Sequence, residues 1–376
     1  MYPLSKDAQA WAASHAEELE QLLLDLCVIP APSGQEEKRA VFCRDWLRAA
    51  GGEAFIDDAL NVVCPIGDDG GPLTVVMAHT DLVFPETTPL PVHIDGDRLC
   101  CPGAGDDTAN LAVLLMSTKF LLEQGLGKGL LIVCNSGEEG LGNLKGCRKI
   151  METYGSRVKE FISLDANMGS ICTKAVGSVR YRVEVRTEGG HSYGAFGNRN
   201  AIRVLASMID ALYTIKPPAI GRTTYNVGTI SGGTSVNTIA QQAEMLYDYR
   251  SDEREGLLFM ERAFRAMAEA FRATGVTVSV EEVGNRPCGG DVDPAAHRAL
   301  IDRAADAEEA VTGMRPSESS GSTDSNIPLS LGIPAVTIGA VSGAGAHTRE
   351  EYILRSSLRE GLQIGLRVLL GSVQMP

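Results

Sequence analysis

The sequence predicts an α/β fold in which a larger domain, built on a mixed and largely parallel sheet, is interrupted by a smaller α+β domain. Short apolar runs separated by helical patterns recur along the chain, which is typical of strands buried on both faces of such a sheet. These runs are residues 73–78, 129–134, 161–165 and 335–339. Residues 181–188 instead alternate strictly between apolar and polar side chains, the pattern of an antiparallel strand with one wet face. At 376 residues the chain is also longer than a single hydrophobic core usually supports, which predicts two domains.

The larger domain opens with two predicted helices. Leucines at helical spacing predict a helix over 8–27, which the Pro-Ala-Pro-Ser-Gly stretch ends. Ser33 and Glu36 form a capping-box pattern that opens a second helix, to about Ala50. A strand over 61–66 and a largely buried helix over 108–122 follow.

The smaller domain begins where apolar and polar residues begin to alternate along the sequence. Its predicted elements are a strand, a helix, two strands, a helix and a strand, over 181–188, 201–213, 225–230, 243–250, 255–273 and 276–283. That βαββαβ order is the ferredoxin-like supersecondary unit. We therefore expect the larger domain to comprise 1–176 and 286–376, with the inserted domain over 177–285.

Composition excludes several classes of partner. The formal net charge of −14 argues against nucleic acid and anionic membranes. No apolar run approaches the ~20 residues of a membrane helix, and the first residues lack the pattern of a secretory signal. The nine cysteines are odd in number and scattered, which favours reduced thiols and a cytoplasmic protein. A reactive or metal-proximal pair at Cys100 and Cys101 is the alternative.

Side chains able to bind a metal follow the predicted buried strands. Carboxyl ends of parallel strands meet at one sheet edge, so we expect these groups to gather there. Several buried acids would repel one another, and no Lys or Arg lies within the motifs to neutralise them. Divalent cations would do so, and imidazole mixed with carboxylate suits zinc. The residues are His79, Asp81, Asp106, Asp107, Glu138, Glu139, Asp165 and His347.

Each of these residues also has an ordinary structural interpretation. A histidine at a strand end can be held by its neighbour, an aspartate at a helix start is commonly a cap, and a Glu-Glu pair can be a solvated loop. Neighbours on an extended chain point in opposite directions, however. Glu138 and Glu139 could therefore divide two tasks, one binding a metal and the other acting as a general base.

The chain resembles the M20 family of co-catalytic zinc metallopeptidases, which includes peptidase T-like aminopeptidases, carboxypeptidase G-like enzymes and N-acyl amino acid amidohydrolases. The motifs that carry the resemblance are His79-x-Asp81, Gly105-Asp106-Asp107, Ser136-Gly-Glu138-Glu139-Gly, Leu164-Asp165, Gly190-His191 and His347-Thr. The resemblance implies a zinc-exopeptidase-like catalytic domain, an inserted lid and dimerisation domain, and a homodimer. It also implies two Zn²⁺ per chain, with Co²⁺ or Mn²⁺ as alternatives.

The resemblance also implies roles for the metal-binding motifs. One zinc would be held by His79 and Asp165, and the other by Glu139 and His347, with Asp106 bridging them. Asp81 would orient His79, and Glu138 would be the general base. Thr108 departs from the family, which has a lysine there, so a positive charge near the carboxylates is missing.

In the inserted domain, His191 resembles the family's lid histidine, which reaches the partner's active site and steadies an oxyanion. Asn237 and Arg250 resemble residues that grip a substrate carboxylate, a task that suits the planar fork of arginine. Asp324 lies in a stretch that resembles a substrate loop. The function expected is hydrolysis of a peptide or amide bond in a small substrate, by an exopeptidase on short peptides. An N-acyl amino acid amidohydrolase and a non-catalytic metal-binding homologue are the alternatives.

Overall fold

The computed structural model describes residues 4–373. The chain divides into two compact units. Unit 1 comprises Met1–Ala175 and Gly290–Pro376, and unit 2 comprises Val176–Gly289. No helix within residues 4–373 is long and apolar enough to cross a membrane.

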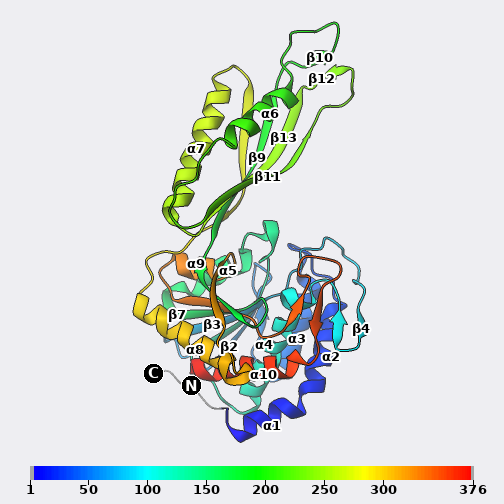
Figure 1. The fold of residues 1–376 in the computed structure, drawn as a ribbon. Helices are drawn as coiled ribbons and strands as arrows, with labels where there is room; N and C mark the ends of the chain where they lie inside the picture. Colours follow the sequence, from blue (N-terminus) through cyan, green and yellow to red (C-terminus); the bar gives the residue numbers. More distant parts are fainter. Residues whose placement is uncertain (1–3, 374–376) are drawn as a thin grey trace. The chain divides into compact units, whose positions relative to one another are not determined.

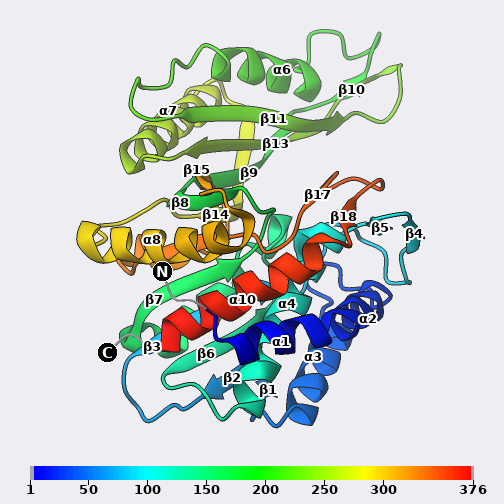
Figure 2. The same ribbon diagram turned by 60° about the horizontal axis from the view of Figure 1, so that its bottom comes forward.

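Unit 1 is built on a mixed sheet (Figures 1 and 2). In spatial order its strands are β1 (Phe55–Ile56), β2 (Val62–Ile66), β6 (Leu130–Asn135), β3 (Leu73–His79), β7 (Val158–Leu164), β16 (Ala335–Ile338), β8 (Ser170–Ala175) and β15 (Ser317–Gly321). Neighbouring strands β6, β3, β7 and β16 are parallel. Strand β1 pairs antiparallel with β2, β2 with β6 and β8 with β16, whereas β15 pairs parallel with β8. The predicted mixed, largely parallel sheet is confirmed.

Both faces of this sheet are covered by helices, because its central strands are apolar on both sides. All seven residues of β3 are buried, with Val76 and Ala78 packed into one core and Val75 and Met77 into the other. The first core is shared with α1 (Lys6–Ser14), α2 (Ala16–Cys27), α3 (Glu37–Ala49), α4 (Ala109–Glu123), α8 (Pro294–Thr312) and α10 (Ser357–Val373). The second is shared with α5 (Lys145–Tyr154) and α9 (Asn326–Ser330).

Two local predictions in the first helices are wrong. The helix expected over 8–27 is divided at His15, whose ring stacks on Trp11 at 3.9 Å between centroids and approaches the Trp11 carbonyl oxygen at 2.8 Å. The capping box is absent because Ser33 donates its hydroxyl hydrogen bond to Asp81 Oδ2 at 2.6 Å instead. Helix α3 begins at Glu37 without a side-chain cap.

Unit 1 also contains short strands and helical turns. A second sheet has the strand order β17 (Gly343–Ala344), β18 (Tyr352–Leu354), β5 (Arg98–Cys100) and β4 (His93–Asp95). Helical turns η1 (Ala104–Thr108), η2 (Gly140–Gly142) and η3 (Gly155–Arg157) join longer elements. All nine cysteines are free.

Unit 2 has the βαββαβ order of elements that its sequence pattern predicts. The elements are β9 (Gly177–Arg186), α6 (Ala201–Leu212), β11 (Thr223–Gly232), β13 (Gln242–Ser251), α7 (Arg254–Arg272) and β14 (Thr277–Arg286). The strands form an antiparallel sheet in the order β11-β13-β9-β14 (Figure 1). Its core joins alternate residues of β9 and β13, including Tyr181 and Tyr247, to Leu205 of α6 and Phe264 of α7. A separate two-stranded ribbon pairs β10 (Gly190–His191) with β12 (Thr238–Ile239).

Candidate metal centre

The carboxyl ends of four neighbouring parallel strands, β6, β3, β7 and β16, meet at one edge of the unit 1 sheet. Strand β3 ends at His79, Asp165 follows β7, and β6 leads into Glu138 and Glu139. His347 comes after β16, on the loop between β17 and β18. The strand order therefore gathers groups that are up to 268 residues apart in the chain (347 − 79).

Asp106 lies between two of these side chains. Its Oδ1 is 3.0 Å from His79 Nε2, and its Oδ2 is 3.0 Å from His347 Nε2. The same nitrogen of His347 is 3.2 Å from Glu139 Oε1. Each oxygen of one carboxylate thus faces a different imidazole, an arrangement suited to a group shared by two metal ions.

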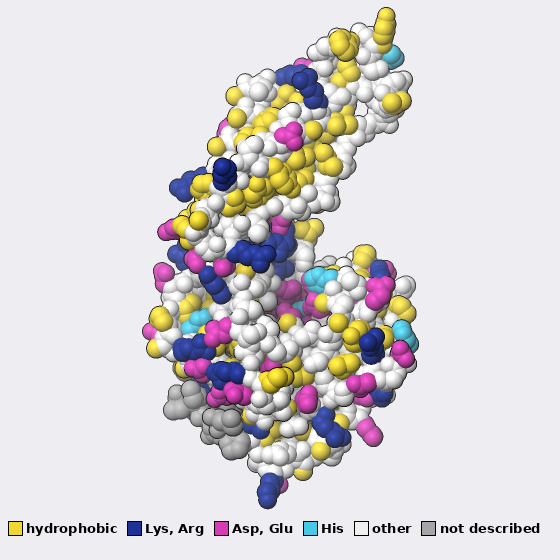
Figure 3. Space-filling model, in the orientation of Figure 1, with side chains coloured by type: hydrophobic (Ala, Val, Ile, Leu, Met, Phe, Trp, Pro, Cys, Tyr) yellow, Lys and Arg dark blue, Asp and Glu magenta, His cyan; other side chains and the backbone are white. Residues whose placement is uncertain are grey.

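The potential ligand atoms fall into overlapping groups, each with all its atoms within 4.8 Å of one another. The groups are His79, Asp106 and Asp165; Asp106, Glu139 and His347; and His79, Glu138 and Glu139. Figure 3 shows acidic and histidine side chains side by side on the face of unit 1 in view. The first two groups are the sets that the resemblance implies for the two metals, and the third brings Glu138 beside them.

Asp81 organises this edge in two ways. Its backbone carbonyl lies 3.0 Å from His79 Nδ1 and its Oδ1 lies 3.5 Å from the same atom, so the ring is held with Nε2 toward Asp106. Its carboxylate also accepts the backbone N–H groups of Glu138 at 2.9 Å and Glu139 at 3.0 Å. Ser33 donates to the same carboxylate. The orientation of the Glu138–Glu139 segment by Asp81 is not visible in the sequence, because the partners lie 57 and 58 residues apart.

Glu138 and Glu139 are not a solvated loop. They are only 6% and 5% exposed, respectively. Two adjacent carboxylates at this depth need positive charge or hydrogen-bond donors nearby.

The turn η1 is held by a residue that sequence reasoning did not single out. Glu351 is buried, and its carboxylate accepts the backbone N–H groups of Gly103 at 2.7 Å, Gly105 at 2.8 Å and Asp106 at 2.9 Å. Asp107 serves a different purpose from Asp106. It is fully buried and accepts the His79 backbone N–H at 3.0 Å.

The pKa values of three side chains at this edge are raised above their ordinary values. Burial raises the pKa of Asp165 to about 7, and the neighbouring Asp106 carboxylate adds to the rise. Hydrogen bonds to Asp106 and Glu139 raise the pKa of His347 to about 10. Burial acts to lower the pKa of His79, but its contacts with Asp106 and Asp81 outweigh burial and raise the pKa.

The acidic groups contribute to all three shifts, because they raise the pKa values of His79 and His347 and add to the effect of burial on Asp165. Metal ions compete with protons for such groups. A set of two imidazoles and several carboxylates suits zinc, and also the related ions cobalt and manganese. The residues present therefore fit a pair of divalent cations.

Two of the three predicted site residues of unit 2 lie close together. His191 on β10 pairs with Thr238 on β12, and the backbone N–H of Ser192 donates to the Asn237 carbonyl at 3.0 Å. The ribbon thus brings His191 and Asn237 together, and both are exposed. Arg250 lies on β13, exposed, with its Nε 2.8 Å from Asp248 Oδ2.

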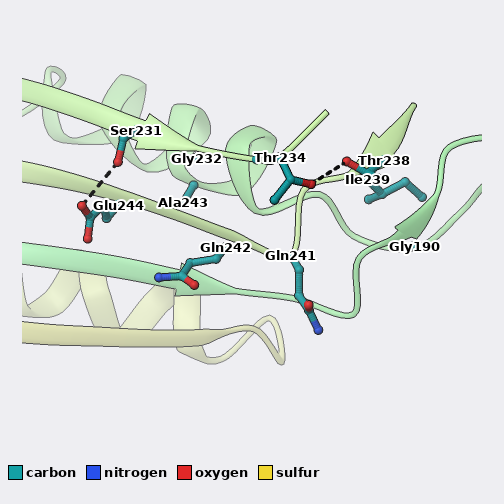
Figure 4. Close-up of a pocket in the computed structure, with 11 residues that line it drawn as sticks. Gly190, Ser231, Gly232, Thr234, Thr238, Ile239, Gln241, Gln242, Ala243 and Glu244 are labelled. Atoms are coloured by element: carbon teal, nitrogen blue, oxygen red, sulfur yellow. Dashed lines mark hydrogen bonds between the residues drawn. The ribbon is translucent and has the colours of Figure 1, made fainter. Parts of the chain in front are cut away.

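A pocket adjoins the ribbon in unit 2 (Figure 4). Its volume is about 580 Å³, and its lining includes Gly190, the residue before His191. Across it, Ser231 donates to Glu244 Oε1 at 3.3 Å, and Thr234 and Thr238 are joined through their hydroxyls at 3.2 Å. The pocket offers hydroxyl, amide and carboxylate groups beside the predicted lid histidine.

Asp324, expected to contact substrate, is 1% exposed in unit 1. Its Oδ2 accepts a hydrogen bond from Asn135 Nδ2 at 2.6 Å, at the end of β6. Its charge contributes to the raised pKa of Asp165. The structure thus places Asp324 beneath the sheet edge, and contact with a substrate stays a prediction.

Comparison with known proteins gives a consistent result. The model of peptidase family M20/M25/M40 matches residues 75–371. A Mycobacterium tuberculosis H37Rv protein, provisionally named succinyl-diaminopimelate desuccinylase, is 26% identical over 365 residues, which are 94% of this chain and 98% of that protein.

Solved structures share the fold. A tripeptidase from Staphylococcus aureus matches with a TM-score of 0.77 and 20% identity, over 96% of this chain and 99% of that chain. A Bacillus subtilis protein described as a dinuclear metal binding peptidase from the M20 family matches with a TM-score of 0.68 and 20% identity, over 97% and 100% of the two chains.

Proposed function

Because the chain belongs to peptidase family M20/M25/M40, we propose that it is a dinuclear, zinc-dependent hydrolase of a peptide or amide bond in a small substrate. His79 and Asp165 would hold one metal and Glu139 and His347 the other, with Asp106 available to both. The observation that carries the proposal is the Asp106 carboxylate, whose two oxygens each lie 3.0 Å from a different histidine nitrogen.

Two divalent cations bound here would acidify a water molecule and polarise the substrate carbonyl. In this proposal the Glu138 carboxylate takes a proton from the attacking water and passes it to the leaving amine. Asp81 supports both parts of the centre, because it orients the His79 ring and accepts the backbone N–H groups of Glu138 and Glu139.

The inserted unit completes the proposal. His191 donates a hydrogen bond to the developing oxyanion, reaching the centre of a partner chain in a homodimer. Arg250 and Asn237 bind a substrate carboxylate, for which Arg250 would exchange its contact with Asp248. Free cysteines support a cytoplasmic location.

Within this reaction we place exopeptidase action on short peptides first. The Gly-Ser-Thr-Asp-Ser-Asn stretch around Asp324 supports it, through its resemblance to peptidase T-like enzymes. Release of an acyl group from an N-acyl amino acid is the second candidate, favoured by the relative named as a desuccinylase.

A matched pair of substrates separates the two. We expect the metal-reconstituted protein to release an amino acid from a free-amine tripeptide at least about tenfold faster, in kcat/KM, than from its N-acetylated form. A tenfold ratio corresponds to about 1.4 kcal/mol of difference in transition-state binding. Release of acetate from the acetylated form that is faster than amino acid release from either form would replace the exopeptidase assignment with the amidohydrolase. Cleavage of neither would favour a non-catalytic metal-binding homologue.

A further inference from the structure

A buried arginine lies beside the candidate metal centre. Arg39 of α3 is 1% exposed. Its Nη1 donates to the Thr80 carbonyl at 2.9 Å and approaches Thr108 Oγ1 at 3.3 Å. Its Nη2 donates to the carbonyls of Leu26 at 3.0 Å and Ile29 at 2.8 Å. Within residues 4–373, each of these bonds ends on a neutral oxygen.

Burying a cation without a directly paired anion is unfavourable, so its retention needs a reason. Among the described residues, Arg39 and Arg286 are the only buried Lys or Arg side chains. Burial lowers the pKa of the Arg39 guanidinium, whereas the thiols of Cys27, Cys43 and Cys101 and the Asp81 carboxylate act to raise it. Asp81 is thus the acid that favours its charge.

The contacts of Arg39 connect two segments that carry proposed ligands. Thr80 lies between His79 and Asp81 at the end of β3, and Thr108 lies two residues after Asp106 in η1. One guanidinium therefore holds the backbone of the first segment and a side chain of the second. Its other two bonds tie both segments to the C-terminal end of α2, at Leu26, and to Ile29 just after that helix.

We propose that Arg39 is a positioning residue that supplies a fixed positive charge beneath the acidic cluster and joins the His79–Asp81 strand end to the η1 turn. The inference rests on the proposed function only for the identity of the ligands. It also accounts for Thr108, where a lysine would bring a second buried cation against the Arg39 guanidinium. The charge missing at Thr108 is supplied by a helix more than sixty residues earlier in the chain (108 − 39 = 69).

The test moves the charge from one residue to the other in the full chain. We expect Arg39→Met and Thr108→Lys each to lower the Tm of the metal-free protein by about 5 °C or more. Arg39→Met removes the buried cation, whereas Thr108→Lys places a second cation against it. The double variant Arg39→Met/Thr108→Lys should recover at least half of the loss seen with Arg39→Met. It should also bind more metal than Arg39→Met in a titration with Zn²⁺.

A matched control separates charge from packing. Arg39→Met/Thr108→Met fills the same space without charge, and we expect it to show no recovery. Equal recovery by the two double variants, or an Arg39→Met protein within about 1 °C of the wild type, would overturn the proposal. If Arg39→Met does not fold, Arg39→Lys and Arg39→Gln carry the test, and a lower Tm for Arg39→Lys than for Arg39→Gln would contradict it. Since Tm is measured without metal or substrate, a protein with no hydrolase activity would leave this result readable.

Discussion

Glu138→Gln is expected to lower kcat by about 10²–10⁴-fold while two metal ions per chain remain bound. The glutamine keeps the shape of the side chain and the backbone N–H that Asp81 accepts, but it cannot take a proton from water. Glu138→Ala should lose turnover as completely. The measurements are kcat on a cleaved tripeptide and metal content by elemental analysis of the same preparation.

Glu160→Gln is the matched control for this variant. Glu160 is partly buried on β7, near the opposite end of the strand from Asp165, where it bonds to Thr74 and pairs with Arg303. We expect that variant to lose some stability and to keep its kcat. If Glu138→Gln retained wild-type turnover, the base would have to be another group.

Asp106→Asn is expected to lower metal content from about two ions per chain to one or fewer, with loss of activity. An amide offers one oxygen and no negative charge, so it cannot replace a carboxylate whose two oxygens face different histidines. Titration with Zn²⁺ in the presence of a competing chelator measures the loss for each site.

The neighbouring Asp107→Asn variant is the control, since both changes are isosteric and adjacent. Asp107 is fully buried, and its two oxygens accept hydrogen bonds from the His79 backbone N–H and from Asn110 Nδ2, neither of which is a proposed metal-binding atom. We expect Asp107→Asn to keep both ions. The opposite pattern, with metal lost from Asp107→Asn alone, would show that the bridging residue has been assigned to the wrong aspartate.

Much of unit 1 could be predicted because its sheet is buried on both faces. Apolar runs such as Leu73–His79 have few interpretations other than a central strand, and the rule that ligands gather at carboxyl ends then groups the side chains. The choice of Asp106 over Asp107 as the bridging residue rests on the resemblance to the M20 family. In the structure the two Asp106 oxygens each lie 3.0 Å from a different imidazole, and the bridging role stays a prediction.

The supporting residues could not be predicted, because their roles depend on contacts between distant segments. Glu351 holds η1 from 245 to 248 residues away, and nothing around it in the sequence indicates a partner. Ser33 matched a capping pattern, but its hydroxyl found a carboxylate in Asp81 instead of a backbone N–H. Arg39 is one of many charged residues in an amphipathic helix, and only its burial distinguishes it.

The roles proposed in unit 2 depend on still less local information. His191 and Asn237 share a ribbon, but they lie on an exposed surface where few packing constraints act. Their proposed work requires a partner chain and a substrate. Sequence reasoning reaches them only through resemblance.

The most direct test of the central claim is amine release from a tripeptide as metal is added back to the metal-free protein. Two ions that share Asp106 predict an activity that is absent without metal, rises with each equivalent of Zn²⁺ and reaches its plateau near two per chain. A chelator should then abolish it reversibly. Full activity at one equivalent, or release that persists after chelation, would contradict the dinuclear account.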